Sequence, residues 1–242
     1  MNGVTLFVSD LHLAAERPRI VELFADFLRD EAANAATLFI LGDLFEYWIG
    51  DDQPTAGLEP VLAGFESLAA CEVPCRFVHG NRDFLLGAEF ARRFNWQLLP
   101  ESTTIDLYGV PTLLLHGDTL CTDDHEYQKM RLMLRDQSWQ QTFLALPLAE
   151  RVRQALALRE RSMNETLEKS ESIMDVNATA VEAAMRRAGV NHLIHGHTHR
   201  PGTHEWIAAN GETLHRAVLG DWYQHGSVLR VSAAGSELAT LS

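Results

Sequence analysis

The sequence is short of cysteine, of basic residues and of long apolar runs, and each shortage excludes a class of protein. Three cysteines among 242 residues are too few and too scattered for a disulfide framework or a zinc knuckle. No stretch approaches the roughly 18 consecutive apolar residues of a membrane span. The N-terminus lacks the basic segment that begins a signal peptide. These features predict a protein of a reducing cytoplasm.

Basic residues are outnumbered, because 20 lysines and arginines stand against 33 aspartates and glutamates, for a formal net charge of −13. Nucleic-acid binding needs a basic face that displaces counterions, so we expect no nucleic-acid partner. No feature of the sequence indicates an obligate protein partner. Residues 129–169 are the exception, with eight basic and five acidic residues. A solvated helical face would explain several of these charges.

Short apolar runs alternate with amphipathic stretches, which is typical of an α/β fold. The length suits a single domain, residues 1–242. Strands are predicted at residues 4–8, 37–41, 75–78, 103–107, 112–115 and 192–194. Helices are predicted at residues 18–31, 58–70, 88–94 and 176–187.

Two segments depart from this alternation. Residues 125–170 show helical periodicity and few strand signals, so we predict a helical lid inserted into the domain. Residues 203–241 alternate short β runs with turns at Asn210-Gly211 and Ala234-Gly235. That pattern predicts a second sheet of antiparallel strands.

The run from residue 37 to residue 41 predicts a strand buried on both faces, and it ends in Gly42-Asp43. In open α/β sheets ligands bind outside the carboxyl ends of the strands, which is where Asp43 would lie. An aspartate there can also simply cap the following turn. The functional interpretation is favoured because other predicted strands end in the same way.

Five strand ends carry residues that bind metals: Asp10-x-His12, Gly42-Asp43, Gly80-Asn81, His116 and His197-x-His199. Alternate residues of an extended segment point the same way, so each pair is expected to face one direction. Imidazole nitrogens with carboxylate and amide oxygens suit Mn²⁺, Fe²⁺ or Zn²⁺. About seven such ligands are too many for one ion. They suit two ions roughly 3.5–4 Å apart, which can bridge a phosphate.

This order of motifs resembles the calcineurin-like metallophosphoesterase superfamily, and the resemblance extends from Asp10 to His199. It implies a sandwich of two central mixed β-sheets flanked by helices. One residue departs from the general pattern, because Arg82 stands where the superfamily carries a histidine viewed as a proton donor. Arginine stays charged at neutral pH but can clamp phosphate oxygens. That suits a leaving group which is itself a phosphate, as in hydrolysis of a P–O–P link.

Further motifs resemble one family within that superfamily, the UDP-2,3-diacylglucosamine pyrophosphatases of bacterial lipid A synthesis. The motifs are GDLFEYW at 42–48, GNRDF at 80–84, HGDTLCTDD at 116–124, IMDVN at 173–177 and GHTHRP at 196–201. The resemblance implies that water attacks the α-phosphate of the UDP group, which releases UMP and 2,3-diacylglucosamine 1-phosphate (lipid X). It also implies Mn²⁺, two ions per chain. Peripheral attachment to the cytoplasmic face of the inner membrane is implied as well.

Residue roles follow from the same resemblance. One ion would be held by Asp10, His12, Asp43 and His199, and the other by Asp43, Asn81, His116 and His197. The residues expected to contact the substrate are Asn81, Arg82, Asp124, Ser162, Thr166, Lys169 and His197. The catalytic residues would be Asn81, Arg82 and Asp43. By spacing alone, residues 162, 166 and 169 form a polar helix face, and only the resemblance favours substrate contact.

A diacyl substrate needs apolar surface, and the predicted lid carries Trp139, Phe143, Leu144, Leu146, Leu148 and Val152. Each buried methylene would favour binding by roughly 0.8 kcal/mol. Alternatively, about half of these residues pack the lid helices against one another. The roles of His79, His125 and His195, which flank the motifs, stay open.

Three other functions compete with this interpretation. The first is another dinuclear-metal nucleotide or phosphoprotein phosphoesterase of the same fold, which Arg82 and the basic, apolar lid disfavour. The second is a non-catalytic binding protein with a remnant metal site, which the intact ligand set disfavours. The third, a nucleic-acid phosphodiesterase, conflicts with the net charge of −13.

Overall fold

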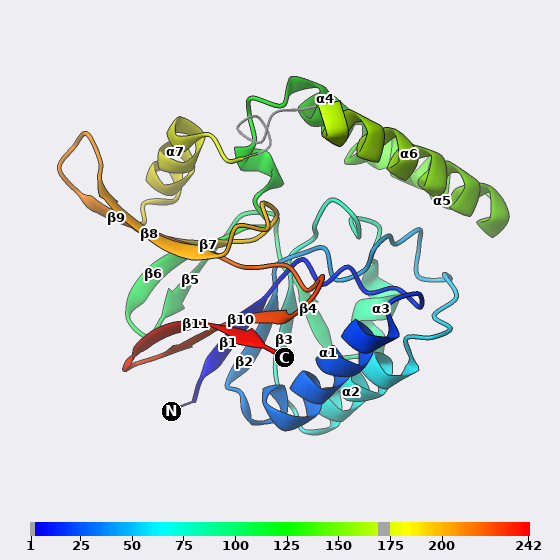
Figure 1. Ribbon diagram of the computed structural model, residues 1–242, viewed down its shortest axis with the longest axis horizontal. Helices are drawn as coiled ribbons and strands as arrows, with labels where there is room; N and C mark the ends of the chain where they lie inside the picture. Colours follow the sequence, from blue (N-terminus) through cyan, green and yellow to red (C-terminus); the bar gives the residue numbers. More distant parts are fainter. Residues whose placement is uncertain (1–2, 169–174) are drawn as a thin grey trace.

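The computed structural model describes residues 3–168 and 175–242, with the side chains of residues 3–160 and 175–242. In this part of the chain, two mixed β-sheets face each other and helices cover their outer sides, which confirms the predicted fold class (Figure 1). The division into a single domain with a lid insertion remains our interpretation.

The first sheet has the strand order β11-β10-β1-β2-β3-β4, in which β1 to β4 run parallel and β10 and β11 are antiparallel. Its strands are β1 (Thr5–Val8), β2 (Thr37–Ile40), β3 (Cys75–Phe77), β4 (Trp96–Leu98), β10 (Gly226–Ser232) and β11 (Gly235–Leu241). Its outer face is covered by α1 (Pro18–Asp30), α2 (Glu59–Ala70) and α3 (Ala88–Arg93).

The second sheet has the order β5-β6-β7-β9-β8, and β6, β7 and β9 are its parallel strands. Its strands are β5 (Thr103–Leu107), β6 (Val110–Leu114), β7 (His192–His195), β8 (Gly202–Ile207) and β9 (Thr213–Val218). Helix α7 (Ala178–Ala188) packs on its outer face. Asn177 caps the start of α7, and Gly189 ends it with a left-handed φ of 67°.

Strand alternation divides the core into layers. In β1, Leu6 and Val8 pack against the outer helices, while Phe7 faces the second sheet. Phe7 and Phe39 stack with their ring centroids 4.9 Å apart, and Ile194 of the second sheet joins the same cluster. Both faces of β1 and β2 are therefore buried, as the continuous apolar runs predict.

Three helices follow β6 in the sequence and form what we call the lid: α4 (His125–Leu134), α5 (Gln137–Leu144) and α6 (Leu148–Glu168). Figure 1 shows them above the sheets as an arm that leaves the sandwich. Asp124 and Asp136 cap α4 and α5 through the backbone N–H groups of Tyr127 and Trp139. None of the helices in the described residues is both long enough and apolar enough to cross a bilayer.

The C-terminal tail corrects one expectation. Residues 203–241 do not form a sheet of their own, because β8 and β9 complete the second sheet while β10 and β11 extend the first. Both predicted hairpin turns are present, but local periodicity cannot name the partner of a strand. The short strand β4 was also not predicted. It is three residues long, and only Phe94 and Asn95 separate it from α3.

Candidate metal centre

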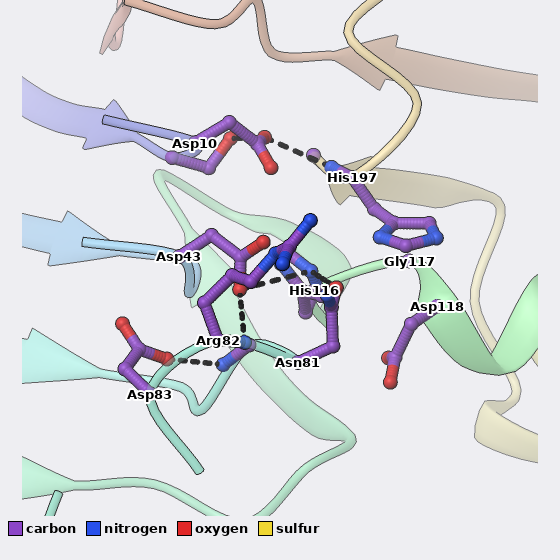
Figure 2. A network of polar contacts seen from close by, with 12 residues as sticks. Asp10, Asp43, Asn81, Arg82, Asp83, His116, Gly117, Asp118 and His197 are labelled. Atoms are coloured by element: carbon purple, nitrogen blue, oxygen red, sulfur yellow. Dashed lines mark hydrogen bonds and ion pairs between the residues drawn. The ribbon is translucent and has the colours of Figure 1, made fainter. Parts of the chain in front are cut away.

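The predicted ligands come together at one edge of the sandwich, where the loops after β1, β2, β3, β6 and β7 meet. Figure 2 shows Asp10, Asp43, Asn81, His116 and His197 around one space, each from a different strand end. Parallel neighbouring strands explain this, because their carboxyl ends lie at the same edge.

One group of ligand atoms surrounds His12. Its Nε2 lies 3.3 Å from His199 Nε2, and His199 Nε2 lies 3.4 Å from Asp10 Oδ1. These three residues offer ligand atoms within 4.8 Å of one another. They could hold one metal ion.

A second group surrounds His116, whose Nε2 lies 3.0 Å from Asn81 Oδ1 and 3.7 Å from Asp43 Oδ1. The His197 ring lies 5.0 Å from the His116 ring, centroid to centroid. The other oxygen of Asp43, Oδ2, lies 3.9 Å from His12 Nε2. Asp43 therefore lies between the two groups, with one carboxylate oxygen toward each.

The backbone at this edge differs from the extended conformation that we expected for the Asp-x-His and His-x-His pairs. Asp10, His12, His197 and His199 have φ between 49° and 70°, and Asp43 has φ of 53°. These left-handed conformations are uncommon outside glycine and concentrate at functional sites. The side chains of each pair converge through tight left-handed turns. The expectation of an extended backbone was therefore wrong, although the side chains do meet.

The motif glycines allow the loops to approach one another closely. A Cβ on Gly80 would collide with the Asp43 carboxylate and backbone, and a Cβ on Gly196 would collide with Ser9 Oγ and Asp10 Oδ2. These glycines are therefore required by the space available, since any side chain would push two ligand loops apart.

Hydrogen bonds from neighbouring groups orient the ligands. His116 Nδ1 lies 2.8 Å from the Leu41 carbonyl oxygen, which leaves Nε2 for a ligand. Asp10 Oδ2 accepts from Ser9 Oγ at 2.5 Å and from the His197 backbone N–H at 2.9 Å. Asp43 Oδ1 accepts from the Arg82 backbone N–H at 2.8 Å.

Burial and crowding shift the pKa values of the cluster in opposite directions. Burial raises the pKa of Asp43 to about 7 and lowers the pKa of His12 to about 3. Burial would also lower the pKa of His116, but Asp43 and other carboxylates outweigh it and raise the pKa to about 9. Groups this crowded and buried hold charge poorly without compensation.

The donor set fits divalent cations. Asp10 Oδ1 and His12 Nδ1 are buried without a hydrogen-bond partner. The His12 and His199 rings approach to 3.3 Å, and Asp43 lies 3.7 to 3.9 Å from His116 and His12. A bound cation would be coordinated by these groups, which would release their protons and reduce the repulsion among them. Oxygen and nitrogen donors without thiolate suit ions such as Mn²⁺, Fe²⁺ or Zn²⁺.

The residues predicted to contact the substrate lie in different parts of the structure. Arg82 lies beside Asp43, and its buried Nε has no hydrogen-bond partner. Asp124 is buried and caps α4. Lys169 lies outside the described residues, as do the side chains of Ser162 and Thr166, whose backbone belongs to α6.

A cavity of about 100 Å³ opens between this edge and the lid. Asn81 and Arg82 line it beside the metal centre, and Trp139 and Phe143 line it from α5. The other lining residues are Glu46, Tyr47, Trp48, Ile49, Phe84, Leu85, Tyr127, Met130, Arg131, Leu134, Arg135, Ala155, Leu158 and Arg159.

The other predicted apolar lid residues do not line the cavity, and neither do they pack only against one another. Leu146, Leu148 and Val152 pack against the main core, and Leu144 is exposed. Phe143 belongs to both environments, because it lines the cavity yet is only 4% exposed and part of the core.

The structure shows where the three histidines without an assigned role lie. His195 is buried, and its Nδ1 lies 2.8 Å from the Gly196 carbonyl oxygen, so it supports the loop that carries His197 and His199. His79 Nε2 lies 2.7 Å from the Leu86 carbonyl oxygen. His125 is exposed at the start of α4.

Sequence reasoning missed two groups near the centre. Glu46 lies 3.6 Å from His12 Nδ1, and a charge inside the apolar run after Asp43 was a usable signal. Tyr223 stacks on the His12 ring at 5.3 Å and on the guanidinium of Arg17 at 4.9 Å. It lies in the tail, where no motif spacing pointed to it.

Comparison with known proteins agrees with this geometry. The family model described as calcineurin-like phosphoesterase matches residues 4–201, which include every predicted metal ligand. The chain belongs to this family.

Curated relatives match over nearly their whole length. The UDP-2,3-diacylglucosamine hydrolase of Serratia proteamaculans is 52% identical over 234 residues, covering 97% of each chain. The protein of the same name from Xanthomonas campestris is 49% identical over 245 residues, covering 98% of this chain and 99% of the relative. A Stenotrophomonas maltophilia protein of that name is also 49% identical, covering 98% of each.

Proposed function

We propose that the chain hydrolyses the pyrophosphate bond of UDP-2,3-diacylglucosamine, giving UMP and 2,3-diacylglucosamine 1-phosphate, in lipid A biosynthesis. One observation carries the proposal: Arg82 lies between a cluster of buried metal-type ligands and a largely apolar cavity. The relatives of that name, about half identical end to end, support the same substrate.

In this proposal the metal centre takes two Mn²⁺ ions. Asp10, His12, Asp43 and His199 would hold one, and Asp43, Asn81, His116 and His197 the other. When bound, the ions supply positive charge for the phosphates and a water of lowered pKa. The Asp43 carboxylate, with one oxygen toward each histidine group, supports its assignment as the bridge.

Arg82 acts as a phosphate clamp. Its backbone N–H is fixed by Asp43 and its carbonyl oxygen accepts from the Trp48 N–H at 2.9 Å, so the side chain starts from a held position. Its buried, unpaired Nε is costly unless an anion binds there. The leaving group is the lipid phosphate, which needs no proton from the protein.

The cavity would receive the lipid end of the substrate. Its volume of about 100 Å³ is well below the 300–1,000 Å³ of typical small-molecule pockets, so a diacyl substrate must displace lid side chains or leave its chains partly outside. Trp139 and Phe84 would contact acyl groups. Asp124, Ser162, Thr166, Lys169 and His197 would contact the headgroup.

The lid also supports attachment to the cytoplasmic face of the inner membrane. Leu132, Met133 and Leu156 are 69%, 47% and 48% exposed on α4 and α6. Apolar side chains beside basic residues suit an anionic lipid surface.

Hydrolysis of the nucleotide lipid in ¹⁸O-labelled water, followed by mass spectrometry, tests the proposed reaction. We expect one label in UMP and none in the lipid phosphate, because attack on the uridine-side phosphorus leaves the lipid with its own phosphate. Label in the lipid phosphate would contradict the assignment. Faster turnover of a simple aryl phosphate than of the nucleotide lipid would favour the general phosphoesterase instead.

A further inference from the structure

Glu46 is an unusual residue for its position. It follows Asp43 by three residues in a run whose neighbours Leu44, Phe45 and Trp48 are buried apolar side chains, and it is only 8% exposed. A carboxylate in such surroundings is unfavourable unless other groups compensate its charge. Its two oxygens show which groups do so.

The first oxygen faces a candidate metal ligand. Glu46 Oε2 lies 3.6 Å from His12 Nδ1. The opposite ring nitrogen of His12, Nε2, points to His199 and Asp43, at 3.3 and 3.9 Å. Nδ1 is therefore the outward atom, and it is buried without a hydrogen-bond partner.

Histidines that bind metals commonly donate the other ring N–H to a carboxylate, which fixes the ring and raises its basicity. At 3.6 Å the Glu46 contact is slightly longer than a hydrogen bond, so a shift of a few tenths of an ångström would complete it. The parallel ring of Tyr223 at 5.3 Å limits how far His12 can tilt.

The second oxygen faces the lid. Glu46 Oε1 lies 3.0 Å from Arg159 Nη2 on α6. Arg159 is partly exposed and lines the cavity together with Glu46 and Arg82. One carboxylate thus joins a metal-type ligand to a lid helix that belongs to a different part of the sequence.

We propose that Glu46 is a positioning residue that couples the lid to the metal centre. It orients His12 for its ion through Oε2, while the Arg159 cation, paired with Oε1, partly neutralises the charge of the same carboxylate. Loss of the Arg159 contact leaves Glu46 to His12 and strengthens metal binding, whereas loss of the carboxylate weakens it. By linkage, whatever draws Arg159 from Glu46 at the lid tightens the His12 ion, and the ion favours that lid state equally. The inference rests on the proposed metal centre.

Calorimetric titration of metal-depleted protein with Mn²⁺ tests it. Glu46→Gln keeps the size of the side chain and should weaken one of the two Mn²⁺ sites by roughly 10- to 100-fold, as such partners of metal-binding histidines do. Arg159→Met should instead tighten that site by roughly two- to fivefold, in line with a partly exposed ion pair. Arg153→Met is the control, since Arg153 pairs on the surface of α6 with Glu150, and it should change nothing.

The double variant Glu46→Gln/Arg159→Met decides whether the two effects share one path. If Glu46 carries the coupling, Arg159→Met has no effect on Mn²⁺ affinity once Glu46 is glutamine. Persistence of the Arg159 effect in that background overturns the coupling, and unchanged affinity in Glu46→Gln overturns the positioning role. A parent protein that binds no divalent ion overturns the proposed function along with this inference. If the parent binds Mn²⁺ and the variants bind it with the same affinity, the inference alone is overturned.

Discussion

Arg82 is the residue that most narrows the chemistry. Replacing it by alanine should lower kcat by roughly 10²-fold or more, because a charged clamp on the reacting phosphate is lost. Metal content should stay at the parent value, since Arg82 contacts Asp43 through its backbone N–H, which alanine retains. Steady-state kinetics and metal analysis of the same preparation measure both.

The pH dependence separates a clamp from a proton donor. In the clamp role, Arg82→Ala lowers activity at all pH values and leaves the shape of the pH–rate profile unchanged. Disappearance of a limb that the parent shows would assign Arg82 a proton-transfer role. Arg82→Lys should recover only part of the lost activity, because an ammonium group lacks the guanidinium fork.

The second prediction about a single residue concerns Gly196. Gly196→Ala places a Cβ against Ser9 Oγ and Asp10 Oδ2, so the loops after β1 and β7 must separate. We expect a loss of about 1–3 kcal/mol in the free energy of unfolding, as for other overpacked sites, and weaker metal binding. Thermal unfolding should show it as a fall of several degrees in Tm.

Gly202 provides the matched control for Gly196. An added Cβ there would meet only His204 Nε2, at an ordinary 3.6 Å, so Gly202→Ala should leave Tm nearly unchanged. Equal losses in the two variants would show that the close approach at Gly196 is unimportant.

At the scale of elements, arginines fix the lid to the strand-end loops. Arg151 of α6 is buried and donates to the Ile49 carbonyl oxygen at 2.6 Å and to Asp52 Oδ1 at 2.7 Å. Arg131 of α4 donates to Asp118 Oδ2 at 2.6 Å, and Arg135 donates to the Gly80 carbonyl oxygen at 2.9 Å. The basic lid residues are thus only partly a solvated face.

Arg151→Met should loosen α6 from the loop after β2, because methionine keeps an apolar stem but leaves the Ile49 carbonyl and Asp52 without their donor. We expect faster cleavage within residues 125–168 during limited proteolysis, with the two sheets intact. Arg153→Met, two residues away on the exposed surface, should be cleaved at the parent rate. Equal protection of all three proteins would remove Arg151 as an anchor.

Elements with strong local patterns could be predicted from sequence to within one or two residues. The predicted strands at 4–8 and 37–41 are β1 and β2, and the predicted helix at 18–31 is α1. Pairing could not be predicted in this way. Strand β10 joins β1 from the far end of the chain, and the alternation of a strand does not reveal its neighbour.

For the whole molecule, the meeting of the proposed metal ligands at one edge was predictable, because each one follows an apolar strand and the fold brings these strand ends together. Partners such as Glu46 and Tyr223 were not found, because their importance depends on which ring they face in three dimensions. The left-handed turns at Asp10 and His197 escaped prediction for a related reason. Tertiary contacts hold those residues in a conformation that their side chains do not favour.

Metal removal provides the last prediction, because the buried cluster makes stability depend on pH. In the metal-free protein Asp43 and its neighbours raise the pKa of His116 from 6.5 to about 9, against the effect of burial. The folded protein then holds this proton more tightly than the unfolded chain. The stabilisation is present below pH 6.5 and is lost as pH rises through 9, by at most ~1.4 kcal/mol per pH unit for one proton.

Bound metal reverses the direction of this dependence. Metal ligands must be deprotonated, so added Mn²⁺ should stabilise the fold more as pH rises from 7 to 9. Thermal unfolding with excess Mn²⁺ and with a chelator should therefore give Tm values that diverge over this range, the chelated protein falling. His12, with a pKa of about 3, does not titrate in this range, and Asp43, with a pKa of about 7, titrates at its lower limit. Parallel curves would mean that neither His116 nor His199, whose pKa Asp10 also raises against the effect of burial, binds the metal.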